Sequence, residues 1–205
     1  MRIGIDFDNT LIDYADLFSR LARERGLVND TVPTDKMAVR DHIRQHHADE
    51  DWQRIQVAVY GERIHLGRFM PGAREFIAHG REHGHELFVV SHKTRFARIA
   101  PDGPDLRQAA LSWMQENSFF APVTSGGFGF AESDVFFAPT RSDKVARINA
   151  LDLDAFIDDL PEILQHPHLN PSVRRVLFTQ TEQCIADAVC GDWSLLFRHF
   201  WKIAD

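Results

Sequence analysis

The chain has 205 residues, 44% of them hydrophobic and 26% charged, which is enough to bury a core without a structural metal. Its 30 acidic residues outnumber its 23 basic ones, and the formal net charge of -7 disfavours nucleic acid or an anionic membrane as the main partner. No apolar run approaches the roughly 18 to 20 residues of a membrane-spanning helix, and Asp6 and Asp8 stand where a signal peptide needs an apolar run. We therefore expect a cytoplasmic protein that binds neither nucleic acid nor membranes. The oligomeric state is not indicated.

The two cysteines, Cys184 and Cys190, lie close together near the carboxyl end. They are too few for a disulfide framework or a zinc site. We expect both to be structural thiols.

Short apolar runs alternate with helical patterns along most of the chain. The expected strands, rich in Val, Ile and Phe, are residues 2–7, 86–90, 135–138, 155–157 and 174–178. The expected helices between them are residues 72–84, 104–117, 142–151 and 160–165. This alternation predicts an α/β fold with a doubly wound, Rossmann-like parallel sheet.

One long helical interval interrupts the alternation. Leu17, Phe18 and Leu21 share one helix face, and a second face of the same kind ends at Gly61. We interpret residues 14–70 as an inserted helical cap, and residues 1–13 and 71–205 as the core. The alternative is a long helical crossover packed on the sheet.

Chemically active side chains follow several of the expected strands. Ligands of a doubly wound sheet collect at the carboxyl ends of the strands, so these side chains are the candidates for a site. They are Asp6, Asp8 and Thr10 after the first strand, Ser91 and His92 after the second, Lys144 after the third, and Asp158 and Asp159 after the fourth.

The four carboxylates of this set would be costly to crowd together unless they bind a cation. Mg²⁺ suits a site with few carboxylates, water and a substrate phosphate. We expect a turn at Asn9–Thr10, and a helix capped by Ser142 with Lys144 in its first turn. A cation there opposes the helix dipole by about 0.3–1 kcal/mol, which a carboxylate cluster or a bound phosphate would offset. Ser91 and His92, with the neighbouring Lys93 and Arg95, form a cationic loop suited to phosphate oxygens.

Four motifs in this order closely resemble the haloacid dehalogenase (HAD) superfamily, over roughly residues 1–178. They are DFDNT (6–10), the serine of VVSHKT (89–94), the lysine of TRSDK (140–144) and the acidic pair of FIDDLPE (156–162). The interval 14–70 falls where members of this superfamily often carry a small helical cap.

The resemblance implies a role for each motif residue. Asp6 would be the nucleophile that forms an aspartyl-phosphate, and Asp8 the general acid and then the general base. Thr10 and Ser91 would contact the phosphoryl group, and Lys144 would bridge it to the nucleophile.

The resemblance also implies a metal site for Mg²⁺. Its ligands would be Asp6, the backbone carbonyl of Asp8, and Asp159, with Asp158 acting through water or supporting the ligands. Which of Asp158 and Asp159 contacts the ion directly is left open.

The expected activity is the Mg²⁺-dependent hydrolysis of a small phosphorylated metabolite, a phosphomonoester. An acid two residues after the nucleophile argues against dehalogenation. Two alternatives remain: a phosphotransferase or mutase acting on a sugar phosphate, and a non-catalytic phosphorylatable or phosphate-binding domain. Signalling receiver domains of the second kind normally place the lysine last, whereas here Lys144 precedes the acidic pair.

Overall fold

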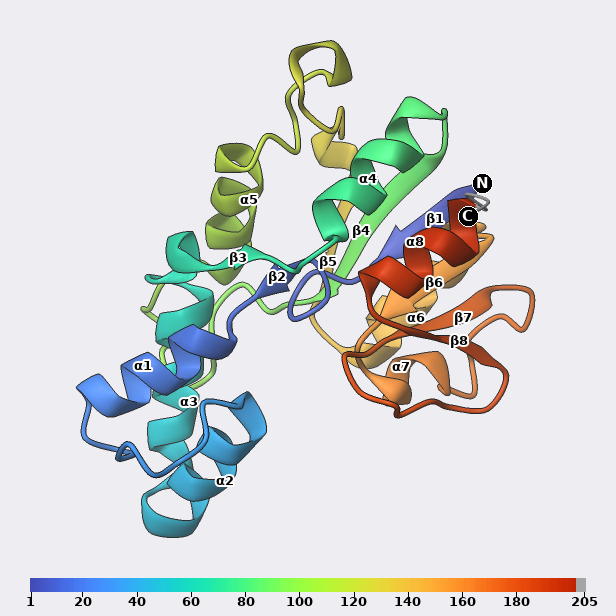
Figure 1. Cartoon of the computed structure of the whole chain (residues 1–205). Helices are drawn as coiled ribbons and strands as arrows, with labels where there is room; N and C mark the ends of the chain where they lie inside the picture. Colours follow the sequence, from blue (N-terminus) through green and yellow to red (C-terminus); the bar gives the residue numbers. More distant parts are fainter. Residues whose placement is uncertain (202–205) are drawn as a thin grey trace. The chain divides into compact units, whose positions relative to one another are not determined.

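The computed structural model describes residues 1–201 and divides into two compact units (Figure 1). Among the described residues, the α/β unit comprises Met1–Ile12, Phe69–Lys93 and Met114–Trp201. The helical unit comprises Asp13–Arg68 and Thr94–Trp113. The chain passes between the units within two short strands, β2 (Ile12–Asp13) and β3 (Arg68–Phe69), which form a two-stranded sheet.

The α/β unit is built on a six-stranded sheet in the order β5-β4-β1-β6-β7-β8, and every pair of neighbouring strands is parallel. The strands are β1 (Arg2–Ile5), β4 (Glu86–His92), β5 (Val135–Ala138), β6 (Ala155–Asp158), β7 (Arg174–Phe178) and β8 (Ala188–Gly191). The predicted α/β fold with a parallel sheet is confirmed. All six carboxyl ends point to one edge, so residues from distant parts of the sequence meet there.

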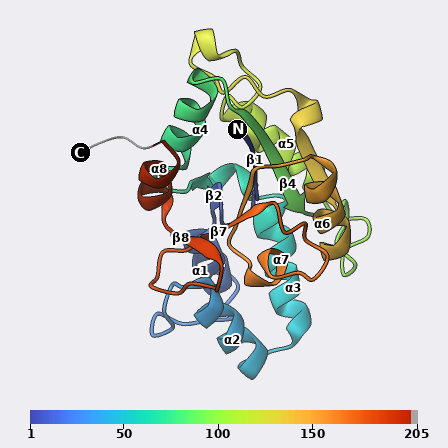
Figure 2. The ribbon, with the colours of Figure 1, turned by 90° about the vertical axis from the view of Figure 1, so that its right-hand side faces the viewer.

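Helices cover both faces of this sheet (Figures 1 and 2). Helices α4 (Ala73–Glu82) and α8 (Trp193–Trp201) lie on one face, and α6 (Arg141–Ala150) and α7 (Pro161–Leu164) lie on the other. Because a strand buried on both faces needs apolar residues at successive positions, β4 contains the run Leu87–Val90. Its Phe88 and Val90 pack in the apolar cluster with Val145 and Ile148 of α6.

Gly4 allows the central strand to pack closely against its neighbour. A Cβ atom at this position would lie 2.5 Å from Leu153 Cδ1 and 2.7 Å from Phe156 Cδ2. Any larger residue would push these core side chains away from β1, immediately before the segment that carries Asp6.

The helical unit contains α1 (Ala15–Glu24), α2 (Lys36–His46), α3 (Asp49–Tyr60) and most of α5 (Leu106–Glu116). Its core is aromatic: the Phe18 ring stacks on Trp52 with centroids 5.1 Å apart, and Tyr14 meets Tyr60 edge to face.

One segment lies outside its expected domain. Residues 94–113, which the sequence prediction assigns to the core, belong to the helical unit. The indole Nε1 of Trp113 donates a hydrogen bond to the Gly67 carbonyl oxygen at 3.0 Å, and the absence of a side chain at Gly61 leaves room for Pro104. These contacts join segments that are distant in the sequence, so local helical periodicity could not reveal them.

Strand β8 and a disulfide were not expected from the sequence. Cys184 and Cys190 are bonded to each other, so the prediction of two thiols is wrong. The chain reverses between β7 and β8 through Asp187, whose φ of 57° is left-handed, and this brings the two Cα atoms within 5.5 Å. Disulfides are rare in cytoplasmic proteins, and the expected location does not account for this one.

Among residues 1–201, no helix is both long and apolar enough to span a lipid bilayer.

Candidate active site

The loop after β1 carries the first motif and reverses the chain directly behind the strand. Asn9 has a left-handed φ of 61°, which asparagine tolerates better than most residues. The backbone N–H groups of Leu11 and Ile12 both donate to the Phe7 carbonyl oxygen, at 3.0 and 3.1 Å. The expected turn at Asn9–Thr10 is confirmed.

Lys144 lies in the first turn of α6, but Thr140 caps this helix. The Thr140 hydroxyl oxygen accepts a hydrogen bond from the backbone N–H of Asp143 at 3.1 Å, so the prediction of Ser142 as the cap is wrong. Helix α6 therefore begins at Arg141, one residue earlier than expected. The carboxylate of Asp143 accepts from the Thr140 hydroxyl at 2.7 Å and completes the cap.

The Lys144 ammonium group is fully buried between two carboxylates. Its Nζ lies 2.6 Å from Asp6 Oδ1 and 2.7 Å from Asp158 Oδ2, joining residues from α6, the loop after β1 and β6. Burial alone would lower the pKa of Lys144, but the carboxylates of Asp158 and Asp6 outweigh it and raise the pKa. Lys144 is therefore a permanent cation, and its carboxylate partners account for its place at the start of a helix.

The positive charge near Asp6 does not offset its burial and the neighbouring carboxylates. Burial raises the pKa of Asp6 to about 7, because the lowering effect of Lys144 is opposed by the nearby carboxylates of Asp158 and Asp8. A carboxylate that is to act as a nucleophile near neutral pH needs a further cation in these surroundings.

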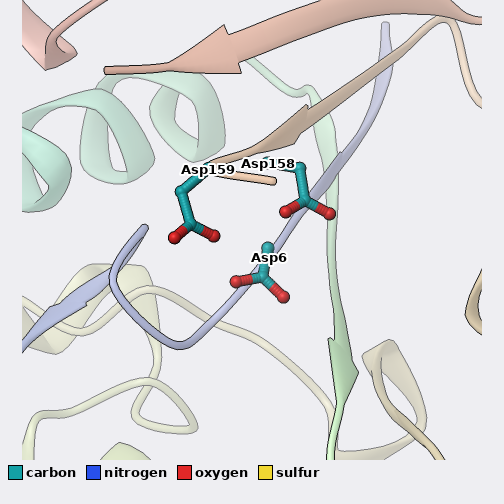
Figure 3. Close-up of side chains that lie close together, drawn as sticks. All are labelled: Asp6, Asp158 and Asp159. Carbon is teal, nitrogen blue, oxygen red and sulfur yellow. The ribbon is translucent and has the colours of Figure 1, made fainter. Parts of the chain in front are cut away.

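Three carboxyl groups come together at the ends of β1 and β6 (Figure 3). Asp6, Asp158 and Asp159 each offer one oxygen, and these oxygens all lie within 4.8 Å of one another. The oxygen ligands of a Mg²⁺ octahedron lie about 3–4 Å apart, given metal–oxygen distances near 2.1 Å. The all-oxygen donor set and the raised pKa of Asp6 therefore fit a hard divalent cation.

The two members of the acidic pair differ in their surroundings. Asp158 is fully buried, and its two oxygens accept from Lys144 and from the backbone N–H of Leu160, the latter at 3.0 Å. Asp159 is partly exposed and takes part in the three-carboxylate group.

Two hydroxyl groups expected to bind phosphate lie against the carboxylates of the first motif. The Thr10 hydroxyl donates to Asp6 Oδ2 at 3.4 Å, and the Ser91 hydroxyl donates to Asp8 Oδ2 at 3.5 Å. Both residues are fully buried. The structure thus brings the first two motifs together across β1 and β4.

The positions of His92 and Lys93 differ from those expected from the sequence. The structure does not bring His92 to these carboxylates: its side chain is exposed, and its Nε2 donates to the Pro139 carbonyl oxygen at 3.2 Å. Partial desolvation of the ring lowers the pKa of His92. Lys93, treated in the sequence only as part of a cationic loop, is buried, and its Nζ lies 2.8 Å from Asp8 Oδ2.

Strand alternation could have identified Lys93. Side chains two residues apart on a strand share a face, so Ser91 and Lys93 lie on the same side of β4, and His92 lies on the other. The backbone N–H of Lys93 donates to the Ala138 carbonyl oxygen at 2.9 Å, which extends the β4–β5 pairing past His92.

The site as a whole carries excess negative charge. Four carboxylates, those of Asp6, Asp8, Asp158 and Asp159, face the two ammonium groups of Lys93 and Lys144. With all six groups ionised the formal charge is -2, which one divalent cation would neutralise.

Comparisons with known proteins agree with this architecture. A hydrolase of the HAD family from Deinococcus radiodurans R1, solved with bound phosphate and sodium, superposes with a TM-score of 0.55 at 13% identity, covering 98% of this chain and 95% of that chain. A predicted phosphoglycolate phosphatase from Haemophilus somnus 129pt superposes with a TM-score of 0.52 at 15% identity, covering 96% of both chains.

A curated protein of Oceanobacillus iheyensis named "Putative nucleotidase" is 24% identical over 172 residues, which cover 80% of this chain and 79% of that protein. No protein-family model matches the chain. The solved structures establish the fold: the chain has the architecture of HAD-superfamily hydrolases, as its motifs predict.

Proposed function

We propose that this protein is a Mg²⁺-dependent phosphatase that hydrolyses a small phosphomonoester through an aspartyl-phosphate. The observation that carries the proposal is the position of Asp6, which contacts the Lys144 ammonium group and belongs to the three-carboxylate group with Asp158 and Asp159. A carboxylate that contacts a fixed cation and belongs to a group able to bind a metal suits a nucleophile for an anionic substrate.

In the first half-reaction an Asp6 oxygen attacks phosphorus while the bond from phosphorus to the ester oxygen breaks. The electron pair of that bond goes to the leaving oxygen, which takes a proton from the Asp8 carboxyl group. Lys144 balances negative charge on Asp6 and on the phosphoryl oxygens, and the hydroxyls of Thr10 and Ser91 donate to those oxygens.

In the second half-reaction a water molecule attacks phosphorus and the bond to Asp6 breaks. Asp8, now a carboxylate, removes a proton from the water, and inorganic phosphate leaves. Asp6 and Asp159 would hold the metal, with the Asp8 backbone carbonyl. When bound, Mg²⁺ supplies positive charge that offsets the phosphoryl oxygens and the nucleophile.

Asp159 is the better candidate for direct contact with the metal. Both oxygens of Asp158 already accept hydrogen bonds, from Lys144 and from Leu160, which suits a supporting residue. The names of the similar proteins suggest nucleoside monophosphates and phosphoglycolate as first substrates to test.

The proposal is tested by replacing the nucleophile. Phosphate release from nucleoside monophosphates, sugar phosphates, phosphoglycolate and p-nitrophenyl phosphate is measured with Mg²⁺ and with EDTA. We expect turnover of at least one substrate with Mg²⁺ and none with EDTA, and a loss of about 1,000-fold or more in Asp6→Asn. The matched control is Asp187→Asn, an exposed loop residue at a left-handed position that asparagine tolerates.

Unchanged turnover in Asp6→Asn would contradict the mechanism. Phosphoryl transfer to an added sugar in preference to water would favour the phosphotransferase alternative. A long-lived phosphorylated protein that releases no phosphate from any ester would favour the signalling alternative.

A further inference from the structure

The buried Lys93 ammonium group has no role in the mechanism above. Its side chain is 3% exposed, and its Nζ lies 3.0 Å from Asp8 Oδ1 and 2.8 Å from Asp8 Oδ2. We propose that Lys93 is a positioning residue that holds the Asp8 carboxyl group in place to deliver its proton to the leaving oxygen. This inference rests on the proposed phosphatase function.

The position of the ammonium group is set by the sheet. The backbone N–H of Lys93 donates a hydrogen bond to the Ala138 carbonyl oxygen of β5. The lysine side chain therefore starts from a fixed point beside Ser91. The Ser91 hydroxyl donates to the same carboxylate from the same strand, at 3.5 Å. Asp8 is therefore held by one donor from β4 and one from the residue directly after it, whereas its own backbone lies in the loop after β1.

The two buried lysines contact different carboxylates. Lys144 contacts Asp6 and Asp158, the nucleophile and a metal-site residue, whereas Lys93 contacts both oxygens of Asp8. Lys144 is thus placed to act on the phosphoryl group, and Lys93 on the acid.

A contact with both oxygens restricts rotation of the Asp8 carboxyl group, which is 17% exposed. When Asp8 is protonated, one oxygen can accept from Lys93 while the other presents its proton to the leaving oxygen. Lys93 keeps its own protons throughout, so the step remains a single transfer from Asp8. Because small misplacements of an acid cost large factors in rate, loss of this contact should impair the proton transfer selectively.

The selective prediction concerns the leaving group. An alkyl alkoxide needs a proton as it departs, whereas p-nitrophenolate departs readily without one. In Lys93→Met we expect kcat/KM to fall about 100-fold for an alkyl phosphate and less than about threefold for p-nitrophenyl phosphate, the same pattern as in Asp8→Asn. Lys93→Arg, which keeps the charge and the donors, should recover most of the activity.

Three controls separate this role from others. Arg54→Met removes an exposed cation of α3 that has no part in the proposed mechanism, and should leave both substrates unaffected. A double variant is measured on phenyl phosphate. In a protein that already carries Asp8→Asn, adding Lys93→Met should lower kcat/KM less than about twofold, because both changes remove the same function. Thermal melts check that each variant folds. If Lys93→Met does not fold, Lys93→Gln replaces it, because glutamine keeps a donor without the charge. Lys93→Gln is then compared with Lys93→Arg on the alkyl phosphate and on p-nitrophenyl phosphate.

The results that would overturn the inference are distinct. An equal loss on both substrates, a rise in KM alone, or additive effects with Asp8→Asn would mean that Lys93 binds the phosphate or supports the fold. Normal wild-type turnover with any of these results overturns only the role of Lys93. A wild-type protein inactive on every phosphate ester overturns the proposed function and this inference together.

Discussion

Lys144 supplies the buried positive charge that two carboxylates of the site share. It is fully buried, yet it remains charged because two carboxylates lie within 2.7 Å of its Nζ. Removing the ammonium group would leave the buried carboxyl groups of Asp6 and Asp158 without their compensating charge, and breaking a buried pair in this way usually costs about 3–5 kcal/mol.

We therefore expect Lys144→Met to lower the free energy of unfolding by about 3–5 kcal/mol, measured by urea denaturation without metal. Mg²⁺ should restore part of the loss, because a divalent cation can occupy the same negative surroundings. The control is Arg20→Met, whose exposed pair with Glu24 is worth about 1 kcal/mol or less. Equal stability of Lys144→Met and wild type would show that these carboxylates need no compensating charge.

At the scale of single elements, helix α6 carries Lys144 to the site, and its first turn depends on Thr140. The Thr140 hydroxyl donates a hydrogen bond to the Asp143 carboxylate, and the same hydroxyl accepts one from the Asp143 backbone N–H. The cap fixes where the helix begins, and Lys144 is the fourth residue of that helix. Correct placement of the lysine therefore depends on a residue outside the site.

Thr140→Ala should lower the free energy of unfolding by about 1 kcal/mol, because an N-cap hydroxyl is lost and the first helical turn frays. Thr140→Ser keeps the hydroxyl and should remain close to wild type. Both values come from urea denaturation under identical conditions. A loss in Thr140→Ser as large as that in Thr140→Ala would place the effect in packing of the threonine methyl group.

At the scale of the whole molecule, the charged site opposes the stability of the fold. The folded-state pKa of Asp6 is about 7, whereas an aspartate in an unfolded chain titrates near 4. Between these pH values the native state holds a proton that the unfolded state releases, so stability falls as pH rises.

The metal-free wild type should therefore lose stability relative to Asp6→Asn as pH rises from 4 to 8. The contribution of Asp6 is fully present below about pH 4 and is lost through pH 7, by up to about 4 kcal/mol. The measurement is the difference in free energy of unfolding between the two proteins across this range. Mg²⁺ should reduce the trend, because the cation stabilises the ionised carboxylate. A difference that does not vary with pH would mean that Asp6 titrates as it does in an unfolded chain.

Part of the molecule follows from local sequence alone. Apolar runs rich in Val, Ile and Phe form strands, and parallel strands have their carboxyl ends at one edge. For this reason the sequence alone assigns to one edge Asp6, Asp8, Thr10, Ser91, Lys144 and the pair Asp158–Asp159. The order of these residues along the chain also indicated the HAD fold, which is confirmed.

Other features depend on contacts between distant segments. The disulfide depends on how the chain returns after β7, and the assignment of residues 94–113 to the helical unit depends on packing against Gly61 and Gly67. Neither leaves a periodic signal in the sequence. In the same way, Thr140 rather than Ser142 caps α6 because its hydroxyl reaches the Asp143 N–H, a matter of backbone geometry.

Sequence thus determined most of the chemical groups that this protein brings to the sheet edge, though not the buried Lys93, because strand ends are encoded by local patterns. Only the tertiary structure decided which group meets which: Lys144 with Asp6 and Asp158, Lys93 with Asp8, and His92 turned toward Pro139. The physical reason is that pairing of charges depends on side-chain reach and on strand register. Both are fixed when β1, β4, β5 and β6 align across the sheet.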